Sequence, residues 1–265
     1  MGTQEARKKM LLISQGTNEG FIMPFKLHAF STTAIIAGIC TVAPADSFNI
    51  GDTDVSLTLL GIGPSRVVSA YYDDGSEVFD RAVWGGQLDW SGGVKTFCVQ
   101  LLETISVGQT RLFDVVEVEN VPEAPPQPGP MGVARATLIS DLYARHYVDM
   151  MSSTGDLAKD KSAAFAMLVW EITHQDSGGN TAATILLDLD LSDGNARFSS
   201  NDTANTFANT WLADLGGGSD DFLGFGGLVG LTDPDTQDYL TVVPGPGGLM
   251  AFIGLASIRR QRRRH

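Results

Sequence analysis

The first half of the chain alternates hydrophobic and polar residues in short runs, the pattern of half-buried β-strands. Val55 to Leu60 alternates Val and Leu with Ser and Thr, and Arg66 to Tyr72 is rich in β-branched and aromatic residues. The turn signal Asp73-Asp74-Gly75 follows, and strand-like runs cover Val94 to Leu102 and Thr110 to Val118. Short strands at this spacing are typical of antiparallel sheets. We therefore predict a β sandwich or barrel.

The middle of the chain changes from alternation to helical spacing. Five of the ten residues from Val121 to Pro130 are proline, which excludes a helix or a central strand and indicates a linker or a stiff surface loop. Apolar residues then recur at helical intervals from Met131 to Met151 and from Leu157 to Thr173. These two segments predict a small helical insert at about residues 131–175.

Strand-like sequence returns in the last third of the chain. Thr184 to Leu191 and Tyr239 to Val243 are rich in Ile, Leu and Val. The glycine-rich stretch between them, residues 216–230, indicates an irregular loop. The expected fold class is therefore α+β, a mainly antiparallel β sandwich or barrel with a two-helix insert.

The end of the chain carries a long uncharged run. No charged side chain occurs from Tyr239 to Ile258, and five arginines follow before His265. A helix rising about 1.5 Å per residue could nearly cross a hydrocarbon core of about 30 Å, and arginines favour the cytoplasmic side. We therefore predict a C-terminal transmembrane helix with the upstream chain exported. An ordinary tail anchor and a buried apolar helix are the alternatives.

The start of the chain has the parts of a signal peptide. Lys26 and His28 form a short basic region, residues 29–42 are apolar, and Ala43-Pro44-Ala45 is a small-x-small cleavage site. Translation starts at Met1 or, because the first 22 residues fit neither a signal nor a fold, at Met23. The sequence thus divides into an N-terminal extension with signal peptide (1–45), an exported domain (46–238) and a C-terminal segment (239–265).

Charge is unevenly distributed along the chain. Of 18 Lys and Arg residues, four precede Ala45 and five follow Ile258, so the part between them keeps nine basic and 29 acidic residues and a net charge near −20. Nucleic acid would repel this part, and no nucleic-acid partner is expected. The chain has only two cysteines, Cys40 and Cys98, which excludes a disulfide scaffold.

The order of the C-terminal parts resembles a PEP-CTERM sorting signal, in which a Pro-x-Pro motif precedes a short Gly, Ala and Leu-rich helix and a basic end. In that family an exosortase, a membrane protease, cuts near the Pro-x-Pro motif. Gly245 stands where the name-giving glutamate would be, and residues 247–258 match the helix. The other matching residues are Val243, Pro244, Pro246, Arg259, Arg260, Arg262, Arg263 and Arg264.

Two internal segments resemble the halves of the thioester domains of bacterial surface adhesins and exosortase-sorted proteins. Trp90 to Leu101 contains Cys98 after an aromatic residue, and Ala163 to Ile172 contains the apolar-Trp-Glu run that ends in Trp170 and Glu171. In that family the Cys sulfur displaces ammonia from a glutamine amide on the helix. Residues 233–238 resemble the closing segment of the same exported proteins.

One departure from the thioester pattern decides the expected chemistry. Ala166 stands where the family pattern places its glutamine, and it has no side-chain carbonyl for a thiol to attack. Gln100, Gln109 and Gln175 are near in sequence, but none occupies the matching position. We therefore expect a thioester-less member of the family, with Cys98 a small buried residue beneath the sheet.

Side chains suited to ordinary catalysis are few between the two terminal signals. The two histidines of this part of the chain, His146 and His174, lie on or at the end of the predicted helices. We expect helix-surface or interface roles for them. A carboxylate pair such as Glu171 with Asp188 or Asp220 would suit a glycosidase, although every acidic protein offers such pairs. We expect no enzymatic activity.

An acidic stretch offers weak calcium candidates. Asp188, Asp190 and Asp193 carry the oxygen ligands that calcium prefers. Gly194 falls one place later than an EF-hand loop requires, so a hairpin turn is the preferred interpretation. No other metal or cofactor is predicted.

These features together predict a non-enzymatic cell-surface or extracellular-matrix protein. Its expected partners are an exosortase-type protease, the membrane through the C-terminal helix, and an envelope or matrix polysaccharide. Two alternatives are a covalent adhesin that forms a thioester at Cys98 and a secreted polysaccharide hydrolase.

Overall fold

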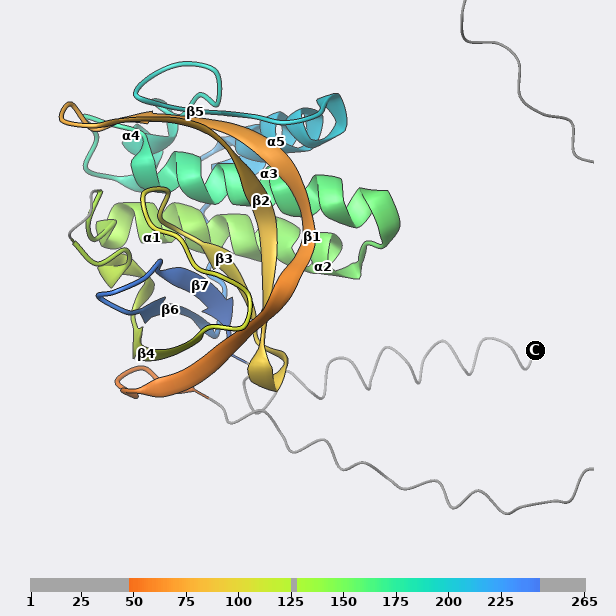
Figure 1. The fold of residues 1–265 in the computed structure, drawn as a ribbon. Helices are drawn as coiled ribbons and strands as arrows, with labels where there is room; N and C mark the ends of the chain where they lie inside the picture. Colours follow the sequence, from red (N-terminus) through yellow and green to blue (C-terminus); the bar gives the residue numbers. More distant parts are fainter. Residues whose placement is uncertain (1–47, 125–127, 244–265) are drawn as a thin grey trace, which may run out of the picture. The chain divides into compact units, whose positions relative to one another are not determined.

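The structure is a computed structural model that describes residues 48–124 and 128–243. Within these residues seven strands pair only in antiparallel fashion, and β1-β2-β3-β7-β6-β4 close into a barrel because β4 and β2 both pair with β1 (Figure 1). The expected α+β class with a mainly antiparallel sheet is confirmed. The strands are β1 (Val55–Asp73), β2 (Val78–Trp90), β3 (Lys95–Cys98), β4 (Thr110–Val116), β5 (Ala196–Ser199), β6 (Leu228–Thr232) and β7 (Tyr239–Val242).

β1 is one long strand where the sequence suggested two. Its first residues pair with β4, its remainder pairs with β2, and residues 69–72 also pair with β5. The register with β2 shifts between Ile62 and Ser65, around Pro64, which has no N–H to donate. Gly86 lies opposite this irregularity with a φ of 150°, and a Cβ there would lie 2.4 Å from the Pro64 carbonyl oxygen. Only glycine fits so close an approach.

The barrel interior is filled by side chains that alternate along the strands. Trp90, Phe113 and Tyr239 contact one another edge-on with ring centroids 5.2–5.7 Å apart, a favourable arrangement of aromatic quadrupoles. The indole Nε1 of Trp90 donates to Thr96 Oγ1 at 2.9 Å, so its buried polar atom is satisfied. The rest of this core consists of Leu57, Leu59, Cys98, Val115, Val229 and Leu231.

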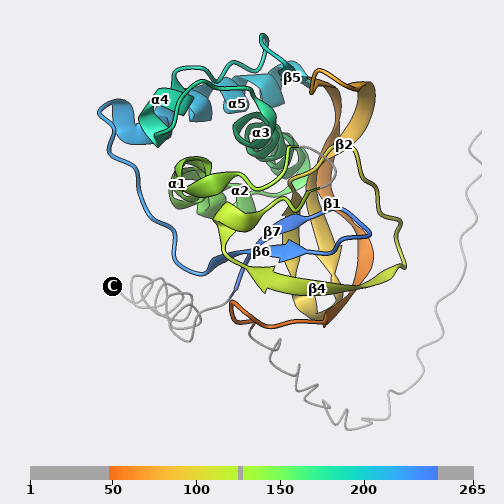
Figure 2. The same cartoon turned by 90° about the vertical axis from the view of Figure 1, so that its left-hand side faces the viewer.

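The helices form a layer beside the barrel (Figure 2). α3 is its centre: every residue from Lys161 to His174 is buried, as expected of a helix that is covered on all sides. It packs against β1 and β2 and is flanked by α1 and α5. The helices are α1 (Gly132–Leu142), continued by a π-helical turn (Tyr143–Tyr147), α2 (Val148–Ser152), α3 (Gly155–His174), α4 (Ala182–Leu186) and α5 (Asp202–Asp214).

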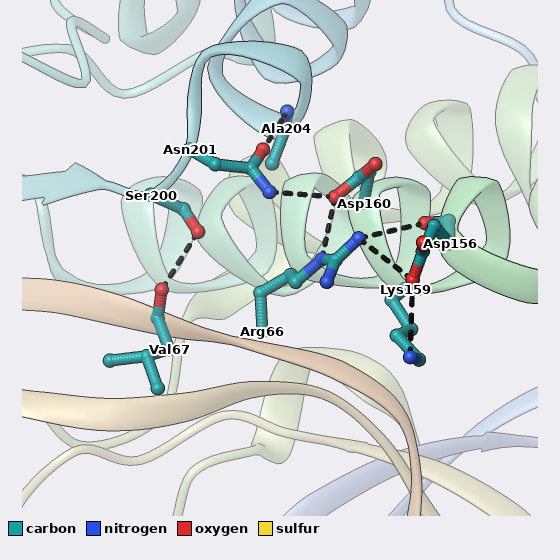
Figure 3. Close-up of polar contacts among 8 residues, drawn as sticks. All are labelled: Arg66, Val67, Asp156, Lys159, Asp160, Ser200, Asn201 and Ala204. Carbon is teal, nitrogen blue, oxygen red and sulfur yellow. Dashed lines mark hydrogen bonds and ion pairs between the residues drawn. The ribbon is translucent and has the colours of Figure 1, made fainter. Parts of the chain in front are cut away.

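A polar clamp joins β1, α3 and α5 (Figure 3). Arg66 Nε donates to Asp160 Oδ1 at 2.7 Å, and Asn201 Nδ2 donates to the same oxygen at 2.8 Å. Asn201 also caps α5, because its Oδ1 accepts from Ala204 N at 2.8 Å. Burial raises the pKa of Asp160, but the hydrogen bonds from Arg66 and Asn201 together outweigh burial and lower it. The ionised carboxylate therefore holds three elements together.

The glycine-rich loop predicted at 216–230 is fixed by one buried carboxylate. Asp141 on α1 accepts hydrogen bonds from Gly216 N at 2.8 Å and Leu223 N at 2.7 Å, and it also pairs with Arg145. Ser140 Oγ accepts from Phe225 N at 2.7 Å. The loop is irregular up to residue 227, as expected, but β6 begins within its predicted span at Leu228.

Several predicted elements need correction. The strand expected at Thr184 to Leu191 is α4 followed by turns, because the side chain of Thr181 caps a helix at its start. For the proline-rich segment the loop alternative holds and the linker does not, since Met131 N donates to Val121 O across its ends. The predicted boundary at residue 238 falls inside the sheet, since β7 pairs with both β3 and β6.

Among the helices at residues 48–124 and 128–243, none is long and apolar enough to cross a membrane. The membrane-crossing helix was expected to start at Leu240, and that start is wrong because residues 239–242 form β7. The apolar helix expected at residues 247–258 and the signal peptide at 1–45 lie outside the described residues.

Candidate functional site

Cys98 is the last residue of β3 and lies in the barrel core, as expected. Its side chain is 9% exposed, and Sγ donates to the carbonyl oxygen of Gln100 at 2.8 Å. Burial raises the pKa of the thiol to about 12, while the Gln100 backbone and the Trp170 indole oppose that rise only in part. Because the thiolate is the nucleophile, this thiol is a poor one at neutral pH.

The helix residues of the thioester resemblance divide between two environments. Trp170 on α3 lines the same cavity as Cys98. Ala166 lies one helical turn earlier on the same face, with its methyl group buried in the apolar core. No side-chain carbonyl is therefore presented from this position.

Glu171 faces another part of the molecule. Its Oε1 accepts a hydrogen bond from Asp190 N at 2.8 Å, and its buried Oε2 has no partner within the described residues. Burial raises the pKa of Glu171 to about 8, although the Asp190 N–H and the charge of Arg135 both act to lower it. Glu171 thus ties α3 to the loop before β5, and this carboxyl is not part of the Cys98 site.

A cavity lies beside Cys98. β2 pairs with β3 only through its residues 87–89. Beyond this pairing, the earlier part of β2 and the segment after β3 are no longer paired with each other. A cavity of about 360 Å³ is lined there by residues from 79–86 and from 100–107. The indole of Trp84, which is 61% exposed, lies among these lining residues. The cavity connects the surface with the thiol of Cys98 and the ring of Trp170.

A polar network joins the segment 233–238 to this region, although its members are far apart in sequence. Gln100 Oε1 accepts from Asp238 N at 2.6 Å, and Asp238 Oδ2 accepts from Glu123 N at 2.6 Å. Gln237 Nε2 donates to Gln100 O at 3.5 Å and to Glu103 O. Burial raises the pKa of Asp238 to about 7 despite its backbone hydrogen bonds. The three segments of the thioester resemblance therefore meet around Cys98.

Gln237 was missed by sequence reasoning. Its side-chain nitrogen and the Cys98 sulfur donate to the same acceptor, the carbonyl oxygen of Gln100. Gln100 itself has its side-chain amide engaged with Asp238 N and Glu123 O. Gln175 is bonded to Ala196 N through its side chain, far along α3. A glutamine that shares an acceptor with the thiol could only have been found through knowledge of the turn between β6 and β7.

The two histidines are buried at interfaces between elements. His146 stacks on Trp211 with centroids 4.8 Å apart, and burial lowers its pKa. His174 Nδ1 lies 3.0 Å from Trp170 O at the end of α3. Burial lowers the pKa of His174 to about 3. Both imidazoles are therefore neutral packing residues near pH 7.

The acidic calcium candidates make local turns. Asp190 Oδ1 accepts from the backbone N and the hydroxyl of Ser192, and Asp188 Oδ2 accepts from Ser177 Oγ at 2.7 Å. Such hydrogen bonds are typical of aspartates in turns. Among residues 48–124 and 128–243, no group of three or more His, Cys, Asp or Glu side chains is placed to hold a metal ion.

Only Val243 of the predicted sorting signal lies within the described residues. Its backbone N donates to Gly227 O at 2.8 Å directly after β7. The prolines, Gly245 and the arginines of the signal lie beyond it. Comparisons with protein-family models, with curated proteins and with solved structures give no match to this chain.

Proposed function

We propose that the chain is the precursor of a non-enzymatic cell-surface or extracellular-matrix protein, exported and then processed through its C-terminal sorting signal. The supporting observation is the order of strands and motifs along the chain. The first strand within the described residues, β1, begins at Val55, after the expected signal-peptidase site at Ala45. The last, β7, ends at Val242, two residues before Pro244 of the Pro-Gly-Pro motif.

The pairing of β7 shows why the position of a cut relative to this strand matters. β7 pairs with β3 on one edge and β6 on the other, so the barrel needs residues up to Val242. The hydrogen bond from Val243 N to Gly227 O is the last backbone tie within the described residues. A cut near Pro244 would leave every described strand paired.

The acidic domain suits a role in adhesion or matrix structure. Its net charge near −20 keeps it soluble and favours bridging by divalent cations such as calcium. We propose an exosortase-type protease as the processing partner, the membrane as the site of the precursor, and an envelope or matrix polysaccharide as the final partner.

The test is fractionation of cells that express the full chain with Pro244→Ala and Pro246→Ala. We expect the double variant to remain a membrane-bound precursor, while the unaltered chain appears at the surface or in the medium at the mass of the cut form. A matched control is the double variant Pro125→Ala and Pro126→Ala, outside the sorting signal, which should be processed normally. Unchanged size and location of the sorting-signal variant would refute the proposal.

A second candidate, the covalent adhesin, is favoured by the position of Gln237. Attack of the Cys98 sulfur on the Gln237 amide carbon would form a thioester and release ammonia. Intact mass would then be lower by one ammonia, and methylamine would open the thioester and add its own mass. Gln237→Glu should abolish both changes, and Gln109→Glu should abolish neither. A free thiol in the unaltered protein eliminates this candidate.

A further inference from the structure

A second cavity lies at the C-terminal end of α3, away from Cys98. It has a volume of about 530 Å³, within the usual range of about 300–1,000 Å³ for small-molecule sites. The end of β1, the start of α1 and the residues that follow α3 enclose it. Its polar lining consists mainly of Tyr72, Asp74, Arg135, His174, Asp176 and Asn195.

Tyr72 supplies a free hydroxyl to the lining of this cavity. Its side chain is largely buried and meets the His174 ring edge-on at 4.8 Å. Its hydroxyl makes no hydrogen bond with any described residue and is not among the atoms closed off from solvent, so it can bind a ligand. His174 Nε2, by contrast, is closed off from solvent, and His174 serves to pack the Tyr72 ring.

The charges around the cavity have mixed signs. The guanidinium of Arg135 donates to Thr173 O and Gln175 O, which fixes it at the end of α3 with other N–H groups left over. The carboxylates of Asp74 and Asp176 line the same space. An anionic ligand would be repelled by these carboxylates, and a cationic one by Arg135.

A neutral ligand rich in groups that both donate and accept hydrogen bonds avoids both repulsions. A sugar hydroxyl can donate to a carboxylate, and it can accept from Arg135 or Tyr72. We infer that this cavity binds a neutral sugar unit of a glycan. The inference rests on the proposed function, since it gives the expected polysaccharide partner a binding site.

The test measures sugar binding by the full-length chain, purified in a detergent without a sugar headgroup. The probes are the methyl glycosides of glucose, mannose and N-acetylglucosamine, with glucuronate as the anionic comparison, and the readout is calorimetry with saturation-transfer NMR. We expect saturable binding of at least one neutral glycoside. Tyr72→Phe should weaken it about tenfold, because only one hydrogen-bonding group is lost.

Tyr71→Phe is the matched control, since Tyr71 is the neighbour of Tyr72 on β1, lies outside this cavity and stacks with Arg197. It should bind like the unaltered chain, and both variants should keep the same thermal unfolding midpoint. No saturable binding of any neutral glycoside by folded protein overturns the inference, as does tighter binding of glucuronate or an equal loss in both variants. The processing assay on Pro244 and Pro246 is independent of this result, so failure here leaves the sorting proposal standing.

Discussion

The buried carboxyl of Glu171 gives a prediction that can be worked through to a magnitude. The side chain is fully buried, one oxygen accepts from Asp190 N, and the other has no partner among the described residues. Burial raises the pKa of Glu171 to about 8, from an ordinary value of 4.5. Glu171→Gln keeps the acceptor for Asp190 N at nearly the same volume and removes the titrating group.

The sign of the effect follows from proton binding. Between pH 4.5 and about pH 8 the unfolded chain has released this proton and the folded chain still holds it, so stability falls as pH rises through this window. Each pH unit within this window lowers the free energy of unfolding by about 1.4 kcal/mol. Between pH 5 and pH 8.5 the free energy of unfolding of the variant should therefore rise relative to that of the unaltered protein by on the order of 4 kcal/mol.

The assay is urea unfolding of both proteins across that pH range. Comparing the two at each pH cancels the contributions of His174, whose lowered pKa works in the opposite direction below pH 6.5, and of Asp238. Glu117→Gln, at an exposed position, is the control, and its free energy of unfolding should differ little from that of the unaltered protein at any pH. A stability difference between the Glu171 variant and the unaltered protein that does not change with pH would refute the reasoning.

Three further perturbations test the fold. Arg66→Met should lower the free energy of unfolding by about 1–3 kcal/mol in urea titrations, because Asp160 loses its cation while almost fully buried. Gly86→Ala should cost at least about 2 kcal/mol because its Cβ would overlap backbone, and Gly61→Ala, with open space around it, should cost far less. Native Cys98 should resist iodoacetamide at pH 8 and react once urea unfolds the chain, as peptide mapping would show.

The strands that could be predicted are those with one face in a core. Val55 to Leu60 and Thr110 to Val116 alternate cleanly because Leu57, Leu59 and Phe113 fill the barrel. β2 was missed because its outward residues include exposed apolar side chains and its inward positions include Gly85, so alternation fails. Gly85 has no side chain because Val68 and Trp170 occupy that space.

The helical layer shows a similar limit. α3 was predictable from its length and apolar content, but α5 was not, since it carries only a narrow buried stripe of Ala204, Ala208 and Trp211. Its start is set by the Asn201 cap, a signal that sequence reasoning could have used. The polar residues that fill the remainder of α5 gave no apolar periodicity to find.

Of the candidate site, the sequence predicts which chemical groups are present but not which of them lie together. The loss of a carbonyl at Ala166 is readable from residue identity alone. The shared acceptor of Cys98 and Gln237, the carbonyl oxygen of Gln100, is not readable, because it depends on β7 returning beside β3, more than 130 residues later. For the same reason the cavity between Tyr72 and His174 has no sequence signature: one residue ends a strand and the other ends a helix.

The position of β7 links folding to the proposed processing. The barrel cannot close until residues 239–242 insert between β3 and β6, since both neighbours would otherwise keep an open edge. These residues form the last strand among those described, and one residue, Val243, separates them from the Pro-Gly-Pro motif. Closure pairs strands that are distant in sequence, which is the slow step in such topologies. A protease that cuts only after Val243 would therefore release a domain that keeps β7 and a closed barrel. A cut a few residues earlier would remove part of β7 and release an open, aggregation-prone sheet.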